Sequence, residues 1–128
     1  MIHEKLLARA AKGTGAAVDF TGKWKNELGS VATIAQTNDV ISGKYVSAVS
    51  EGGTTTTGVL SGFVDGNLIS FVVHWDDFQA ITAWVGQLDP KAPTQTINTL
   101  WQMTQKVAPG DEWASINAGA DYFVRIAQ

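Results

Sequence analysis

Small polar side chains alternate with aromatic ones at several places in this sequence. Asn26 stands two positions after Trp24, and Thr82 stands two positions before Trp84. Because residues two apart share one face of a β-strand, each pair would set a hydrogen-bonding group beside an aromatic surface. A core built only for packing would avoid this mixture, since an unpaired buried hydroxyl or amide costs about 1–3 kcal/mol. The pattern is typical of a small-molecule cavity, and a core whose polar groups are all satisfied explains it about equally well.

Four predicted strands carry a mixed face of this kind. The members of these faces are Trp24, Asn26 and Leu28 with Ser30 just beyond; Tyr45, Ser47 and Val49; Phe78, Ala80, Thr82 and Trp84; and Thr99, Trp101 and Met103. The opposite faces hold side chains suited to solvent, namely Lys23, Lys25, Glu27, Lys44 and Gln102. The inward faces would therefore form an aromatic box with a few polar groups.

The elements that must position these residues are predicted strands. Thr, Val, Ile and aromatic residues alternate with polar ones, and Gly, Asn and Asp interrupt them at short spacing. The predicted strands are 20–27, 30–37, 40–49, 57–65, 68–76, 79–87, 95–106 and 112–126. Strands joined by such short turns favour an all-β fold, an eight-stranded antiparallel up-and-down β-barrel, because closure removes exposed strand edges. A β-sandwich is the alternative.

The first 18 residues differ from the rest, so we predict an N-terminal extension over 1–18 and a barrel domain over 19–128. Ile2, Leu6 and Ala10 are spaced by four, which is consistent with a short helix. The apolar run that begins at Leu6 is interrupted by Arg9, which makes it too short for the core of a signal peptide. We therefore expect a disordered or short helical extension.

Length and composition narrow the class of protein. A chain of 128 residues suits one domain with a core of its own. The 9 Lys and Arg against 12 Asp and Glu give a net charge of −3, which argues against a nucleic-acid partner. The sequence has no cysteine, which excludes disulfides and thiolate metal sites. No apolar run approaches the roughly 20 residues of a membrane helix, so no membrane partner is expected.

No catalytic or metal-binding set can be assembled from the remaining polar residues. The histidines are His3 and His74, and His74 has the opposite parity to Trp75, so it should face outward. Two isolated histidines without cysteine do not make a metal site, and no Ser-His-Asp arrangement forms. The adjacent acids at 76–77 and 111–112 are expected to be solvated turn residues. We therefore expect no enzyme activity.

Separated motifs agree in order and spacing with one known family. They are Thr-Gly-Lys-Trp-Lys-Asn-Glu-Leu-Gly-Ser at 21–30, Gly-Lys-Tyr-Val-Ser-Ala-Val at 43–49, Trp75 with Thr-Ala-Trp-Val-Gly-Gln at 82–87, Ile-Asn-Thr-Leu-Trp at 97–101, then Trp113 and Asp121. Over residues 20–126 the chain resembles the avidin and streptavidin family. The resemblance implies a barrel that binds biotin tightly and noncovalently, without catalysis or a cofactor.

The resemblance also implies roles for individual residues. Asn26, Ser30 and Tyr45 match the family's three donors to the carbonyl oxygen of biotin's ureido group. Ser47 and Asp121 match the acceptors for the two ureido N–H groups. The other matched residues are Thr82 beside the ring sulfur, Trp75, Trp84 and Trp101 as aromatic walls, and Leu28, Val49 and Met103 as gap fillers.

Assembly and location follow from the same resemblance. Trp113 matches the residue that the family lends to a neighbouring subunit's pocket, which implies a homotetramer whose sites are closed across an interface. Family members are usually exported, so we expect a secreted or periplasmic protein, although no signal peptide is visible in the chain.

The sequence departs from the family pattern at the end of the pocket that would hold biotin's carboxylate. Ala80 stands where the family commonly has Ser, and Phe78 stands where avidin has Ser. Recognition of the carboxylate would then depend on the loop near Ser50 and Glu51, on the hydroxyls at 54–57, or on water. We expect weak discrimination between biotin and its amides.

Two other classes of binding protein remain as alternatives. A lipocalin-like or fatty-acid carrier would share the barrel, but its lining would be more uniformly apolar. A Trp-rich carbohydrate-binding module would place its aromatic residues on an exposed face.

Overall fold

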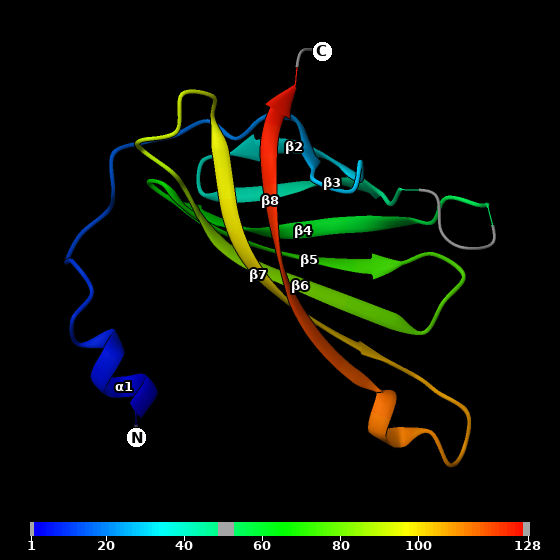
Figure 1. Cartoon of the computed structure of the whole chain (residues 1–128). Helices are drawn as coiled ribbons and strands as arrows, with labels where there is room; N and C mark the ends of the chain where they lie inside the picture. Colours follow the sequence, from blue (N-terminus) through cyan, green and yellow to red (C-terminus); the bar gives the residue numbers. More distant parts are fainter. Residues whose placement is uncertain (1, 49–52, 127–128) are drawn as a thin grey trace.

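The computed structural model shows one closed antiparallel β-barrel, and it describes residues 2–48 and 53–126 (Figure 1). Its strands follow one another around the barrel in chain order. They are β1 (Gly22–Asn26), β2 (Val31–Thr37), β3 (Val40–Val46), β4 (Thr57–Asp65), β5 (Leu68–Trp75), β6 (Ala80–Leu88), β7 (Thr96–Gln105) and β8 (Ile116–Ile126). The predicted eight-stranded up-and-down barrel is confirmed.

Burial alternates along the strands, as expected for a barrel with one face inside. In β4, Leu60 and Val64 are buried while Val59 and Phe63 are exposed. The solvent-facing side chains expected from parity at Lys23, Lys25, Glu27, Lys44 and Gln102 are all exposed. Side-chain parity in the sequence therefore separates the barrel interior from its surface.

Stacked aromatic rings form the centre of the core. The Trp84 ring stacks on Tyr45 at a centroid distance of 4.9 Å and on Phe71 at 5.1 Å. Phe123 meets these rings edge-on, at 6.0 Å from Phe71 and 6.3 Å from Trp84. Such offset and edge-on pairs stabilise by roughly 0.5–1.5 kcal/mol each beyond the area they bury. They fix the position of Trp84, which also faces the cavity described below.

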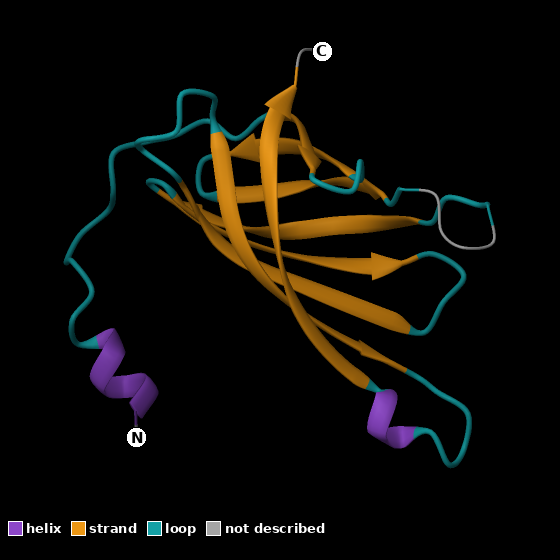
Figure 2. Cartoon of the chain, in the orientation of Figure 1, coloured by secondary structure: helices purple, strands orange, loops and turns teal. Residues whose placement is uncertain are grey.

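Two strand ends differ from the prediction by three residues or more, and the others differ by at most two. The third strand ends at Val46, because Ser47 and Ala48 leave the ladder, and residue 49 lies outside the described residues. The eighth strand begins at Ile116 because Glu112–Ala114 forms a 3-10 turn, labelled η1. Figure 2 shows this turn before the last strand. The acids and Trp113 in this segment carried no helical periodicity that would have indicated it.

The N-terminal segment begins with an exposed helix, α1 (Ile2–Leu7), which lies apart from the barrel (Figure 1). Nearer the barrel the segment is attached by hydrogen bonds. The Gly15 N–H donates to Asp65 at 2.9 Å, and the Gln36 amide donates to the Val18 carbonyl at 3.0 Å. No helix among the described residues is long and apolar enough to cross a membrane.

Arg125 of β8 forms hydrogen bonds with the segment before β1, at the place where the first and last strands close the barrel. The first and last strands pair in antiparallel register, with Trp24 opposite Arg125. The Arg125 guanidinium donates to the carbonyls of Thr21 and Asp19 at 2.6 Å each, and it lies 4.3 Å from the centre of the Trp24 ring. A planar fork of donors over an aromatic face is an arrangement that lysine cannot reproduce.

We predict that Arg125→Lys lowers the free energy of unfolding by roughly 1–2 kcal/mol, because it removes hydrogen bonds from a charged donor at the seam. Denaturant unfolding of both proteins measures the change. Arg9→Lys, in the exposed N-terminal segment, is the control and should leave the unfolding midpoint unchanged. Equal midpoints for Arg125→Lys and the parent would show that the seam does not depend on the guanidinium.

Candidate functional site

A cavity of about 210 Å³ opens between the strands beside Trp84. Its lining comes from both halves of the chain and consists of residues that the sequence had singled out. They are Asn26, Leu28, Ser30, Tyr45, Ser47, Trp75, Thr82, Trp84, Trp101, Met103 and Asp121.

Asn26 presents its amide nitrogen to the cavity. Its side-chain oxygen accepts the backbone N–H of Leu28 at 3.0 Å and that of Ser30 at 2.8 Å. Its nitrogen donates to the Tyr45 hydroxyl at 3.3 Å. Because an amide nitrogen carries two hydrogens, one remains for a ligand. The tight turn after β1 thus orients the amide as a donor.

Two hydroxyls, those of Ser30 and Tyr45, line the cavity with this amide. The Ser30 oxygen accepts the Ala48 N–H at 2.8 Å, and the Tyr45 oxygen accepts from Asn26. Burial raises the pKa of the Tyr45 phenol well above its ordinary value; a hydrogen bond from Ser30 partly offsets this, and the charges of Asp121 and Glu27 add to it. Tyr45 therefore stays neutral and able to donate.

Asp121 is the carboxylate of the cavity. Its Oδ2 accepts the Trp84 indole N–H at 2.9 Å, and its backbone carbonyl accepts the Thr99 hydroxyl at 2.9 Å. The bond from Trp84 holds the side chain while leaving lone pairs on both oxygens, since an ionised carboxylate offers about four acceptor sites. Ser47 lies among the same lining residues, and its hydroxyl accepts the Thr56 N–H at 3.0 Å.

The aromatic walls are held by polar contacts and by close packing. The Trp75 indole donates to the Thr82 hydroxyl at 2.9 Å and meets Tyr45 edge-on at 5.4 Å. Trp101 lies against the backbone of β8, where a Cβ added to Gly119 would come within 2.5 Å of its ring. Glycine at this position therefore lets the Trp101 wall lie against the strand.

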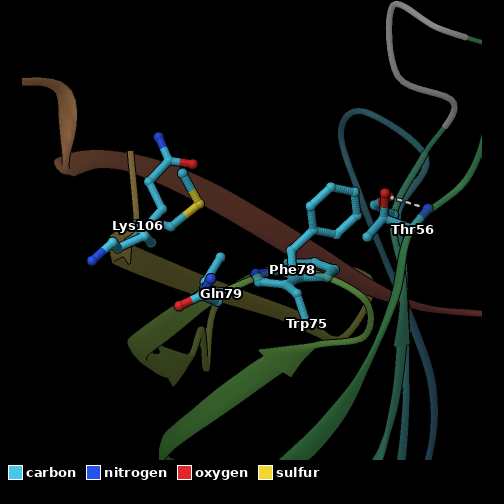
Figure 3. A pocket seen from close by; sticks show the side chains of 9 residues that line it. Thr56, Trp75, Phe78, Gln79 and Lys106 are labelled. Atoms are coloured by element: carbon cyan, nitrogen blue, oxygen red, sulfur yellow. Dashed lines mark hydrogen bonds between the residues drawn. The ribbon is translucent and has the colours of Figure 1, made fainter. Parts of the chain in front are cut away.

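A wider cavity of about 500 Å³ adjoins the first and opens to solvent (Figure 3). The two share Ser47, Trp75 and Met103 in their linings. The remaining lining residues of this outer cavity are Thr56, Phe78, Gln79, Ala80, Gln105 and Lys106. Together the cavities lead from an aromatic interior with a few polar groups to a mouth that carries Thr56, Gln79, Gln105 and Lys106.

Some predicted site residues are exposed, line neither cavity or lie outside the described residues. Leu28 borders the inner cavity but is 74% exposed, and Phe78 is 60% exposed in the turn before β6, where strand parity no longer applies. Trp113 is 84% exposed on η1 and lines neither cavity of its own chain. Val49 and Ser50 lie outside the described residues.

The sequence reasoning missed Gln79, Gln105 and Lys106, which line the outer cavity. Glu27 is exposed, as strand parity predicts, and partial burial and the neighbouring Asp121 carboxyl raise its pKa. Gln79, Gln105 and Lys106 stand at strand ends, where periodicity gives no orientation.

The described residues contain no cluster of three or more His, Cys, Asp or Glu side chains placed to hold a metal ion. His74 is exposed on β5, opposite Ile81 of β6, as its parity predicts. Every buried side-chain N or O atom in the described part of the chain has a hydrogen-bond partner. The arrangement is that of a binding cavity with oriented donors and acceptors.

Comparison with known proteins gives a consistent result. The model of the Avidin family matches residues 14–126. Avidin-related protein 1 of Gallus gallus is 32% identical over 93% of this chain and 86% of its own length, and Gallus gallus avidin is 29% identical over 94% and 87%. The crystal structure of Xenavidin superimposes with a TM-score of 0.71 at 26% identity, covering 87% of this chain and 100% of that one. The chain therefore belongs to the avidin family.

Proposed function

We propose that this protein binds biotin noncovalently in the inner cavity and carries out no catalysis. The observation that carries the proposal is the placement of donors and acceptors. Asn26, Ser30 and Tyr45 form one group of donors, and Asp121 and Ser47 supply acceptors from the same lining. A ureido group, with one carbonyl oxygen and two N–H groups, is the ligand chemistry that complements this set.

Donors and acceptors acting on opposite ends of a ureido group reinforce each other. Three donors converging on the carbonyl oxygen draw electron density toward it, as an oxyanion hole does. The N–H groups then become better donors, and a carboxylate acceptor such as Asp121 forms a charge-assisted bond with one of them. Such bonds are stronger inside a dry cavity than at a surface.

The walls support binding of a compact ring system. Trp75, Trp84 and Trp101 offer flat apolar surface, and the Thr82 hydroxyl lies among them. The polar lining distinguishes this cavity from one suited to fatty acids. A carbohydrate-binding module would expose its aromatic rings, whereas Trp84 is buried.

We predict that the parent binds one biotin per chain and that Asp121→Ala weakens binding by roughly 1.5–3 kcal/mol, or about 10- to 150-fold, because it removes a charged acceptor. Calorimetric titration and dissociation rates measure the effect. Asp39→Ala, in the turn before β3, is the control and should bind as the parent does. An unchanged dissociation rate in Asp121→Ala would refute this use of the cavity.

We also propose that the protein is a homotetramer in which Trp113 closes the cavity of a neighbouring subunit. An 84% exposed tryptophan is costly to leave in water, and it stands on the η1 turn beside the end of β7. The outer faces of β4–β7 are also apolar. Their exposed large side chains are Val59, Phe63, Leu68, Val72, Ile81, Val85 and Leu100.

Light scattering should therefore give a mass four times the chain mass of 13.6 kDa. Trp113→Lys should speed biotin release by roughly tenfold or more, because a buried interface aromatic contributes on the order of 2 kcal/mol. Leu7→Lys, in the exposed helix α1, is the control. A monomeric parent, or release unaffected by Trp113→Lys, would contradict this role.

The carboxylate end of biotin would lie in the outer cavity. There Phe78 and Ala80 offer no hydroxyl, while Thr56, Gln79 and Lys106 lie around the opening (Figure 3). This end is open to water, so its polar contacts are weaker than those of the inner cavity. We propose that the protein therefore discriminates weakly between biotin and biotin amides.

Ala80→Ser should favour free biotin over its amide, relative to the parent, by up to roughly tenfold, because the new hydroxyl adds a hydrogen bond to a charged group. The ratio of the two dissociation rates measures this. Ala83→Ser is the control, because Ala83 has the opposite parity to Ala80 on the same strand, and it should leave the ratio unchanged. A parent that already releases the amide far faster than biotin would show that another strong carboxylate contact exists.

A further inference from the structure

The outer cavity is larger than the carboxyl end of biotin requires. Its volume of about 500 Å³ is more than twice the 210 Å³ of the inner cavity, to which Ser47, Trp75 and Met103 join it. Cavities of ~300–1,000 Å³ commonly enclose a whole drug-sized ligand, whereas a carboxylate is a small group. A ligand held by its head group in the inner cavity therefore has room here for atoms beyond its tail.

A third hollow, the rim groove, continues from the outer cavity onto the outside of the barrel. Its volume is about 460 Å³. It shares with the outer cavity four residues where β6 begins and β7 ends, namely Gln79, Ala80, Gln105 and Lys106. Its remaining lining is a row of neighbours across β5, β6 and β7, namely His74, Ile81 and Thr104. The three hollows thus form one connected path.

The pairing of β6 with β7 explains why the same residues line the inside and the outside. In the ladder Ala80 lies opposite Gln105, and both line the outer cavity. One position further, the Lys106 N–H donates to the Gln79 carbonyl at 2.9 Å, so this second pair has the outward parity. The two pairs form the rim where the interior of the barrel meets its surface. In Figure 3, Gln79 and Lys106 lie on one side of Trp75 and Thr56 on the other.

The path offers apolar surface together with amide groups. Phe78 is 60% exposed at the opening of the outer cavity. The Gln105 amide donates to the Ala114 carbonyl at 3.3 Å, which holds the side chain while its oxygen is available as an acceptor. A peptide carries a donor and an acceptor on each residue, with side chains between them, so its chemistry complements such a surface.

Lys106 gives the path its charge. It is exposed and lines both the outer cavity and the rim groove, where His74 is the other titratable group. Among the described residues, neither lining contains Asp or Glu, although the whole chain carries a net charge of −3. Asp76, in the turn before β6, accepts the Thr57 hydroxyl at 2.6 Å and lines neither hollow. The path is therefore locally positive on an acidic protein.

We infer that the connected hollows form one path for a biotin amide in which the carboxyl group of biotin is joined to a peptide. This inference rests on the proposed function, because the head group is taken to occupy the inner cavity. The peptide crosses the rim beside Gln79 and Lys106 and continues along the rim groove. An acidic side chain close to the amide bond then lies beside Lys106 and strengthens binding, whereas a basic one weakens it.

The experiment compares the rates at which the full chain releases three biotin conjugates, made with the C-terminally amidated peptides Gly-Asp-Asp, Gly-Ser-Ser and Gly-Lys-Lys. We expect the acidic conjugate to leave slowest and the basic one fastest, with a difference of roughly threefold or more at low salt that shrinks at high salt, because exposed ion pairs are weak and screened. Lys106→Glu should reverse the order. Lys91→Glu changes the net charge equally, but in the loop at the other end of β6, and should keep the parent's order.

A photochemical crosslink maps the route independently of charge. A biotin amide whose peptide carries a diazirine is bound and illuminated, and mass spectrometry identifies the labelled segments, with excess biotin as the competitor. Labels that biotin suppresses are expected at residues 79–81 and 104–106. Equal release of the three conjugates, or labels confined to other parts of the mouth, would overturn the inference while biotin binding stands. If neither biotin nor its amides bind, the proposed function fails and this inference fails with it.

Discussion

The antiparallel pairing of the first strand with the last is the constraint on which the site depends. It brings the end of β1, with Asn26, beside the stretch of β8 that carries Asp121. Residues separated by most of the chain thereby line one cavity, a donor on one strand and a carboxylate on the other. The contacts of Arg125 with the segment before β1 lie along the same seam. An open sheet would leave these two edges apart and exposed.

The core and the cavity share their structural elements. Trp84 stacks between Tyr45 and Phe71 as a core residue, and its indole N–H holds the cavity carboxylate. Asn26 is fixed by the backbone of the turn that follows it, so its amide cannot rotate freely. Preorganisation of this kind reduces the entropy lost when a ligand binds. The rigidity of the barrel is therefore part of how the proposed site would bind tightly.

Strand parity in the sequence predicted the barrel and most of the residues that line the inner cavity, because a regular strand fixes which side chains point inward. Trp75 and Asp121 were predicted from the resemblance to the avidin family. The prediction of side-chain orientation was less accurate for residues beyond the ends of the strands. Phe78, for example, lies in the turn before β6, where strand parity does not apply. The η1 turn that carries Trp113 is too short to produce a periodic signal. Contacts between the first and last strands also depend on closure, which alternation along a single strand does not encode.

The central claim is that the inner cavity recognises a ureido group through donors at one end and acceptors at the other. The most direct measurement is a calorimetric titration of the protein with biotin and, in parallel, with an analogue methylated on both ureido nitrogens. We expect one biotin bound per chain and a loss of affinity of at least a hundredfold for the analogue, which cannot donate to Asp121 and Ser47. Equal affinity for the two compounds, or no binding of biotin, would contradict the claim.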